Sequence, residues 1–224
     1  MKKPIAIALA LPALLFAGHA LAAGGHHSVD DANILPRGEC EQETWFSREQ
    51  GNTRALHAGV NCRVGPVELG LAGEHARGGG EGSATAWNVE VKWAREVAEG
   101  LNIGFDLQPV WQAHQRPRFE ATRFAALATW VPHAAWGVHL NIGRDFVRSG
   151  PNLARYGVGV DWAPINRWTL TAERFLEERT HFLRAGVRWA GGQLWTLDFS
   201  RAQRLSGPAP SNWTIGVTFD LDDD

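Results

Sequence analysis

Apolar and polar residues alternate with a period of two through almost the whole chain beyond residue 38. Successive side chains of a β-strand point to opposite faces of a sheet, so this period indicates strands with one apolar and one polar face. Turn residues interrupt the pattern about every 15 residues, which predicts an antiparallel all-β meander. The clearest runs are 87–93, 101–108, 136–143, 156–162, 183–189, 195–200 and 213–221, and weaker ones lie near 40–48, 53–63, 66–75, 119–131 and 167–177.

The polar face of these runs carries many charged residues. A soluble barrel could bury the apolar face as its core, whereas a membrane barrel would turn that face to lipid. In a bilayer, a charge on the lipid face near the midplane costs roughly 2–4 kcal/mol, so the charges of a membrane barrel would have to face the lumen. The lumen residues expected on this interpretation are Glu68, Glu90, Lys92, Asp106, His139, Asp145, Arg155, Asp161, Glu173, Arg184, Arg188 and Asp198.

The distribution of the 11 tryptophans favours the membrane barrel. Several of them fall close to alternate turns, which would lie at one rim of an up-and-down barrel. Aromatic belts of this kind are expected at a membrane boundary, where an indole combines an apolar body with an N–H donor. We therefore predict an antiparallel up-and-down transmembrane β-barrel of about 12 strands over residues 40–221. Its girdle would comprise Trp93, Trp130, Trp136, Trp162, Trp168, Trp189 and Trp195.

The N-terminus has the pattern of a secretory signal peptide over residues 1–22. Lys2 and Lys3 form a basic region, residues 5–17 form an apolar region, and the small residues at 20–22 form a cleavage site. Without these two lysines, 20 of the 22 basic residues remain against 24 acidic ones, a balance that argues against nucleic acid as a partner. Residues 23–39 are expected to be a flexible lead-in, and residues 222–224 an acidic tail.

The two cysteines, Cys40 and Cys62, are an even pair in an exported chain, which favours a structural disulfide. Residues 49–52 have turn character and lie midway between them. A hairpin about Gly51 would place the cysteines opposite each other on neighbouring strands. We expect a disulfide between them.

The leader, the aromatic rims, the alternating strands and the final segment 213–221 together resemble the small outer-membrane β-barrel proteins of Gram-negative bacteria. The resemblance covers roughly residues 40–221 and is architectural. It implies a location in the cell outer membrane, with outer-membrane lipid and the barrel-assembly machinery as partners. The chain departs from the usual aromatic last residue, because it continues past Phe219 to Asp224.

The segment that follows the leader holds a compact set of metal-capable side chains, His26, His27, Asp30 and Asp31. Imidazole and carboxylate ligands suit Cu(II), Ni(II) or Zn(II), and a Gly-Gly-His start would supply a tetragonal site for Cu or Ni. Alternatives are a flexible polar lead-in and a small plug inside the lumen. No motif requires a cofactor.

The sequence contains no catalytic motif such as a Gly-x-Ser-x-Gly elbow, so an enzyme is not expected. Acidic and histidine residues near the other turns, including Glu74 and Glu177, are interpreted as solvated rim charges. A two-residue turn at 178–179 would place Glu173 opposite Arg184. The favoured function is a narrow pore or transporter for small polar solutes or ions. Alternatives are an envelope protein that binds copper through its histidine segment and a soluble periplasmic ligand-binding barrel.

Overall fold

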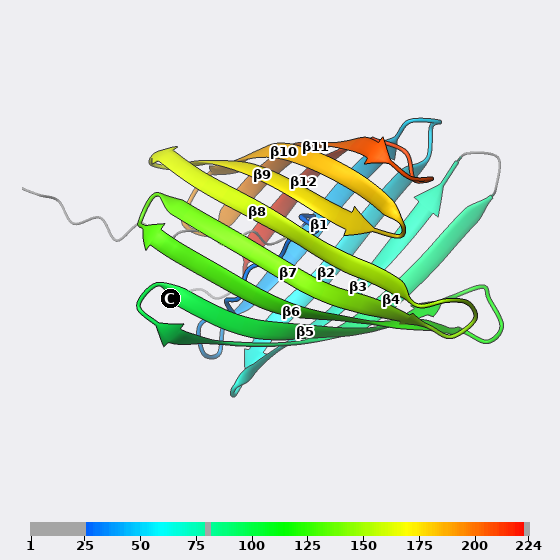
Figure 1. Cartoon of the computed structure of the whole chain (residues 1–224), viewed down its shortest axis with the longest axis horizontal. Coiled ribbons are helices and arrows are strands. Elements are labelled where there is room, and N and C mark those ends of the chain that lie inside the picture. The colour runs from blue at the N-terminus through cyan, green and yellow to red at the C-terminus, as the bar shows by residue number, and fades with distance from the viewer. Residues whose placement is uncertain (1–25, 79–81, 222–224) are drawn as a thin grey trace, which may run out of the picture.

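Each alternating run forms one strand, and the strands pair antiparallel in chain order until β12 closes on β1 (Figure 1). The computed structural model describes residues 26–78 and 82–221, so the predicted leader and acidic tail lie outside the described residues. Within those ranges it contains no helix long and apolar enough to cross a bilayer. The strands are β1 (Cys40–Glu49), β2 (Arg54–Val64), β3 (Val67–Arg77), β4 (Ser83–Ala98), β5 (Leu101–Gln112), β6 (Phe119–His133), β7 (Trp136–Val147), β8 (Leu153–Ile165), β9 (Trp168–Glu177), β10 (Thr180–Ala190), β11 (Trp195–Ser206) and β12 (Asn212–Asp220).

The register of the sheet follows from short hairpins. Glu178 and Arg179, with φ of 46° and 66°, form the two-residue link between β9 and β10, the left-handed backbone that such tight hairpin turns require. This turn pairs Glu173 with Arg184, as predicted. On the other side of the ring, β1 pairs with β12 from Glu41 opposite Asp220 to Glu49 opposite Asn212, which closes the barrel.

The outer surface of the barrel is apolar and the interior is polar. Large hydrophobic side chains on the outer face are widely exposed, such as Ile142 at 66% and Leu140 at 56%. Charged and hydroxyl side chains between them on the same strands are buried inside. This arrangement is the reverse of that in a soluble barrel and confirms the predicted transmembrane barrel fold.

The seven girdle tryptophans lie on the outer face, close to the hairpins at one end of the barrel. Their rings form contacts around this rim. The centroids of Trp136 and Trp162 are 5.5 Å apart, and those of Trp189 and Trp195 are 5.3 Å apart. At the opposite end, Trp87 stacks on Trp111 with centroids 4.2 Å apart. We call the first end the tryptophan rim; the aromatic side chains of Trp93, Trp130, Trp136, Trp162, Trp168, Trp189 and Trp195 define it.

The predicted disulfide is present. Cys40 and Cys62 are directly opposite each other at the start of β1 and near the end of β2, and their sulfurs are bonded at 2.11 Å. The bond lies at the tryptophan rim, where the N-terminal segment leaves the lumen and becomes β1. It therefore fixes the point at which that segment is tethered to the wall.

Candidate functional site

The predicted lumen residues all lie on the inner side of the barrel. Ten of them are buried. Glu90 and Arg155 are partly buried and line the lumen cavity. The ten buried residues are Glu68, Lys92, Asp106, His139, Asp145, Asp161, Glu173, Arg184, Arg188 and Asp198.

Buried arginines on one side of the lumen are neutralised by carboxylates on the adjacent strands. Arg184 Nη1 lies 2.7 Å from Glu173 Oε1. Arg188 Nε lies 2.8 Å from Asp198 Oδ1. Burying a charge is costly unless it is paired and hydrogen-bonded, so these cross-strand pairs explain how the wall from β9 to β11 tolerates its arginines.

The N-terminal residues 26–35, which we call the strap, run inside the ring of strands (Figure 1). The strap starts beside β11, where His26 Nε2 lies 2.7 Å from Ser200 Oγ. It ends beside β3, where the Leu35 backbone N–H donates to Glu68 Oε2 at 2.8 Å. The expectation of a flexible lead-in is therefore wrong for these residues, because the polar lumen satisfies their backbone groups; the alternative of a small plug describes them.

The first polar anchor of the strap is Glu173 on β9. Its carboxylate accepts hydrogen bonds from the backbone N–H of Val29 at 2.8 Å and of Ser28 at 3.3 Å. Arg184 donates to the carbonyl of His26 at 2.7 Å while it pairs with Glu173. One ion pair of the wall thus binds both a donor and an acceptor of the strap backbone.

Val29 is the apolar anchor of the strap. It is 1% exposed and packs with Phe175 and Phe182. Glycines on β8 make room for it, because a Cβ added at Gly157 would lie 2.5 Å from Val29 Cγ2, and one at Gly159 would lie 3.3 Å from Val29 Cγ1. The small-residue inner face of β8 is therefore a socket for one strap side chain.

The second polar anchor is Lys92 on β4. Lys92 Nζ lies 2.8 Å from Asp30 Oδ2 and 3.8 Å from Asp31 Oδ1. Nearby, the backbone N–H of Ala32 donates to Thr129 Oγ1 at 2.8 Å. Thr129 in turn bonds to a ring nitrogen of His139 at 2.9 Å. The strap therefore spans the lumen between anchors on opposite sides of the ring.

Burial changes the proton affinity of two strap side chains. Loss of solvent raises the pKa of Asp30 to about 6, although the neighbouring Lys92 acts in the opposite direction. Loss of solvent lowers the pKa of His26 well below its ordinary range, with the charges of His27 and Arg184 acting in the same direction. The two groups therefore respond to pH in opposite senses.

The four predicted metal ligands are divided between the two polar anchors. His26 and His27 stack with ring centroids 4.6 Å apart near Ser200 and Glu173. Asp30 and Asp31 face Lys92 instead. In the part of the chain that the structure covers, no group of three or more His, Cys, Asp or Glu residues is arranged to hold a metal ion. Gly24 and Gly25 of the candidate Gly-Gly-His motif lie outside the described residues.

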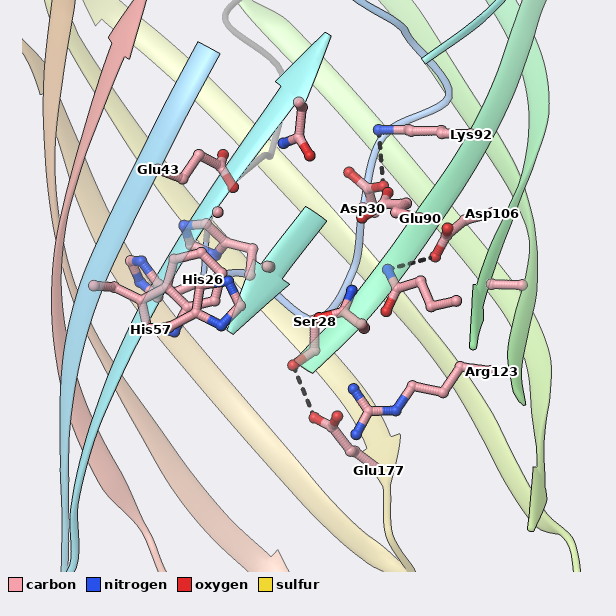
Figure 2. Close-up of a pocket in the computed structure, with 18 of the residues that line it drawn as sticks. His26, Ser28, Asp30, Glu43, His57, Glu90, Lys92, Asp106, Arg123 and Glu177 are labelled. Carbon is pink, nitrogen blue, oxygen red and sulfur yellow. Dashed lines mark hydrogen bonds and ion pairs between the residues drawn. The ribbon is translucent and has the colours of Figure 1, made fainter. Parts of the chain in front are cut away.

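The strap leaves two separate spaces in the lumen. One is a cavity of about 360 Å³, the acidic cavity, which is lined by the strap, by β1 to β5 and by residues of β6 to β10 and β12 (Figure 2). The other, of about 640 Å³, opens among the hairpins of the tryptophan rim. Eight lining residues of the acidic cavity are carboxylates, namely Asp30, Glu41, Glu43, Glu68, Glu74, Glu90, Asp106 and Glu177, and four are bases, namely Lys92, Arg123, Arg155 and Arg184.

Sequence interpretation missed several residues of this cavity. The inner face of β1 carries Glu43 and Trp45, but both faces of that run are mixed in polarity, so its pattern selects neither. Trp45 stacks on His57 of β2 with ring centroids 3.5 Å apart. Glu74 and Glu177, interpreted as solvated rim charges, also line the cavity. The period-two alternation of β9 could have identified Glu177, since it continues the inward series of Glu173 and Phe175.

Comparisons with known proteins agree with this architecture. The chain matches the family described as "Uncharacterised conserved protein UCP029691" over residues 11–221 and belongs to it. No curated protein matches it in sequence. Among solved structures it is similar to the KdgM porin, with a TM-score of 0.62 at 11% identity, covering 81% of this chain and 99% of that chain. The NanC porin gives a TM-score of 0.60 at 10% identity, covering 80% and 100%. The toluene transporter TbuX of Ralstonia pickettii gives 0.52 at 11% identity, covering 84% and 90%.

Proposed function

We propose that the chain is a channel of the Gram-negative outer membrane that passes small polar solutes or ions through a lumen narrowed by its own N-terminal strap. The observation that carries this proposal is the polar lumen itself, which keeps two open spaces beside the strap. A barrel that served only as an anchor would gain nothing from open volume lined by charged groups. The porins and the transporter with the same fold support a channel by analogy.

The strap sets the width of the passage. It crosses the lumen between Glu173 and Lys92, so a solute has to pass beside it or displace it. Most of its contacts are hydrogen bonds and ion pairs, which water can replace when the strap leaves the wall. The proposed channel is therefore narrow when the strap is docked and wider when it is released.

We do not assign to this chain the ligand of the KdgM porin, one of its structural relatives. A KdgM porin structure is described in complex with oligogalacturonate, a polyanion. In this chain the lining of the acidic cavity contains twice as many carboxylates as bases, eight against four. Like charges in a confined lumen repel the solute, so an acidic oligosaccharide is disfavoured here.

A flux assay tests the proposal. The purified protein is reconstituted into lipid vesicles, and vesicle swelling is followed after mixing with polar solutes of graded size. We expect swelling with the smallest solutes and a sharp fall as solute size increases, because the strap occupies part of the lumen. Vesicles that contain heat-modifiable, inserted barrels but admit no solute above the protein-free rate would refute the proposed function.

A further inference from the structure

The carboxylates of the acidic cavity are not balanced by its bases. We define the acidic wall as Glu41 and Glu43 of β1, Glu90 of β4 and Asp106 of β5. Lys92 lies beside this wall, but it is already paired with the strap aspartates. The other paired bases are Arg184, which binds Glu173, and Arg155, which binds Asp145 and Glu177.

Hydrogen bonding leaves the acidic wall with unused acceptor capacity. Glu41 accepts one bond, from Asn61 at 3.3 Å, and Glu43 has no hydrogen-bond partner within the described ranges. Asp106 is 9% exposed and accepts from Gln108 through Oδ2 at 2.9 Å. Its other oxygen, Oδ1, has no nitrogen or hydroxyl donor among the described residues; the Glu90 carboxyl is its neighbour in the wall, and the Asp106 side chain lines the cavity. A buried carboxylate oxygen of this kind can accept a hydrogen bond from a donor that enters the cavity.

The cavity already accommodates an ammonium group. Lys92 Nζ lies 2.8 Å from Asp30 Oδ2, in the same space as Glu90 and Asp106 (Figure 2). By sheet register, Lys92 is flanked by Glu68 on β3 and by Asp106 on β5. An ammonium is therefore compatible with the shape and charge of this part of the lumen.

An aromatic surface adjoins the acidic wall. Trp45 and His57 stack nearly parallel, at an interplanar angle of 7°, and both line the cavity. Trp45 lies two residues from Glu43 on the inner face of β1. A Trp ring beside carboxylates attracts organic cations through the ring quadrupole as well as through charge.

Resting on the proposed channel function, we propose that the acidic wall binds small organic ammonium ions and that these are the solutes the channel passes. The carboxylates supply the charge, Asp106 Oδ1 supplies a vacant acceptor, and Trp45 supplies a face for the carbon skeleton. Short diamines fit this chemistry best, because two ammonium groups can reach carboxylates on different strands.

The test compares the wild-type protein with a variant that carries Glu43→Gln, Glu90→Gln and Asp106→Asn. Each change keeps the shape of the side chain and removes its charge. Glu178→Gln, in the exposed turn between β9 and β10, is the matched control. Folding of every variant is checked by heat-modifiable migration, and Glu43→Gln alone replaces the triple variant if that fails to fold.

In planar bilayers under a KCl gradient, we expect the wild type and the control to prefer potassium over chloride, and diaminobutane to block their current. Three unit negative charges, each about 8 Å from a permeating ion in water, together favour potassium over chloride by about tenfold. The triple variant should lose this preference. A channel without cation preference, or one that diaminobutane blocks equally in the triple variant, overturns the inference while the channel function stands.

A binding measurement separates the two proposals. Diaminobutane should raise the melting temperature of the detergent-solubilised wild type but not that of the triple variant, because it binds the folded barrel. If diaminobutane raises the melting temperature of the wild type only and the barrel shows no conductance, the binding site stands and the channel function is refuted. An unchanged melting temperature in both proteins would overturn the binding site.

Discussion

Replacing Val29 should release the strap and widen the channel. Val29 is 1% exposed in a socket formed by Gly157, Gly159, Phe175 and Phe182. Val29→Ala removes two buried carbons at about 0.8 kcal/mol each, so it should shift the docking equilibrium by roughly tenfold. Val29→Asp should shift it further, since it also buries a carboxylate against the apolar socket at a cost of about 2 kcal/mol or more.

Single-channel recording in planar bilayers measures the effect. We expect larger or longer openings in the order wild type, Val29→Ala, Val29→Asp. Gly159→Val should act in the same direction from the opposite side, because its side chain would enter the space that Val29 occupies. Val64→Asp, at a rim position that is 53% exposed, controls for the added charge. If the folded Val29 variants conducted like the wild type, the strap would not limit the passage.

Three further predictions concern pH, lipid contact and the disulfide. In His26→Gln, Asp30 is the strap group that still titrates; because docking raises its pKa to about 6, docking should strengthen as pH falls from 6 towards 4. In Asp30→Asn, His26 is the group that still titrates; because docking lowers its pKa, docking should weaken as pH falls below 6.5. Conductance against pH should therefore slope in opposite directions in the two variants, and equal slopes would contradict this account. Ile142→Arg should lower the free energy of unfolding from lipid vesicles by about 2–4 kcal/mol, whereas an unchanged denaturation midpoint would argue against a lipid-facing surface. Replacing Cys40 and Cys62 by serine should lower the free energy of unfolding by about 3 kcal/mol, because the bridge spans 22 residues. The barrel should then unfold at a lower temperature in the heat-modifiable gel assay. An unchanged unfolding temperature would mean that the bridge is dispensable.

Local chemistry was sufficient to predict the barrel. The alternation of a strand depends only on consecutive residues, because successive side chains point to opposite faces of the sheet. The runs found in the sequence therefore agree with the observed strands to within a few residues at most ends. The longest deviation at one end is β11, which extends to Ser206, beyond the run that ends at residue 200. The pairs Cys40–Cys62 and Glu173–Arg184 were predictable because a tight turn between neighbouring strands sets the register.

The strap could not be predicted because its partners are distant in sequence. His26 meets Ser200, 174 residues away, and Ala32 meets Thr129, 97 residues away. The segment has no period that would indicate docking, and its histidines and aspartates are equally suited to a metal or to lumen charges. The inner face of β1 was ambiguous for a related reason, since Trp45 faces a polar lumen and Phe46 faces outward.

The most direct test of a strap-narrowed channel is a single-channel recording of the purified wild-type protein in a planar bilayer, made alongside the same barrel without residues 26–35. We expect discrete small conductance steps for the wild type and larger steps after the strap is removed. Correctly inserted barrels that stay silent in both forms would contradict it.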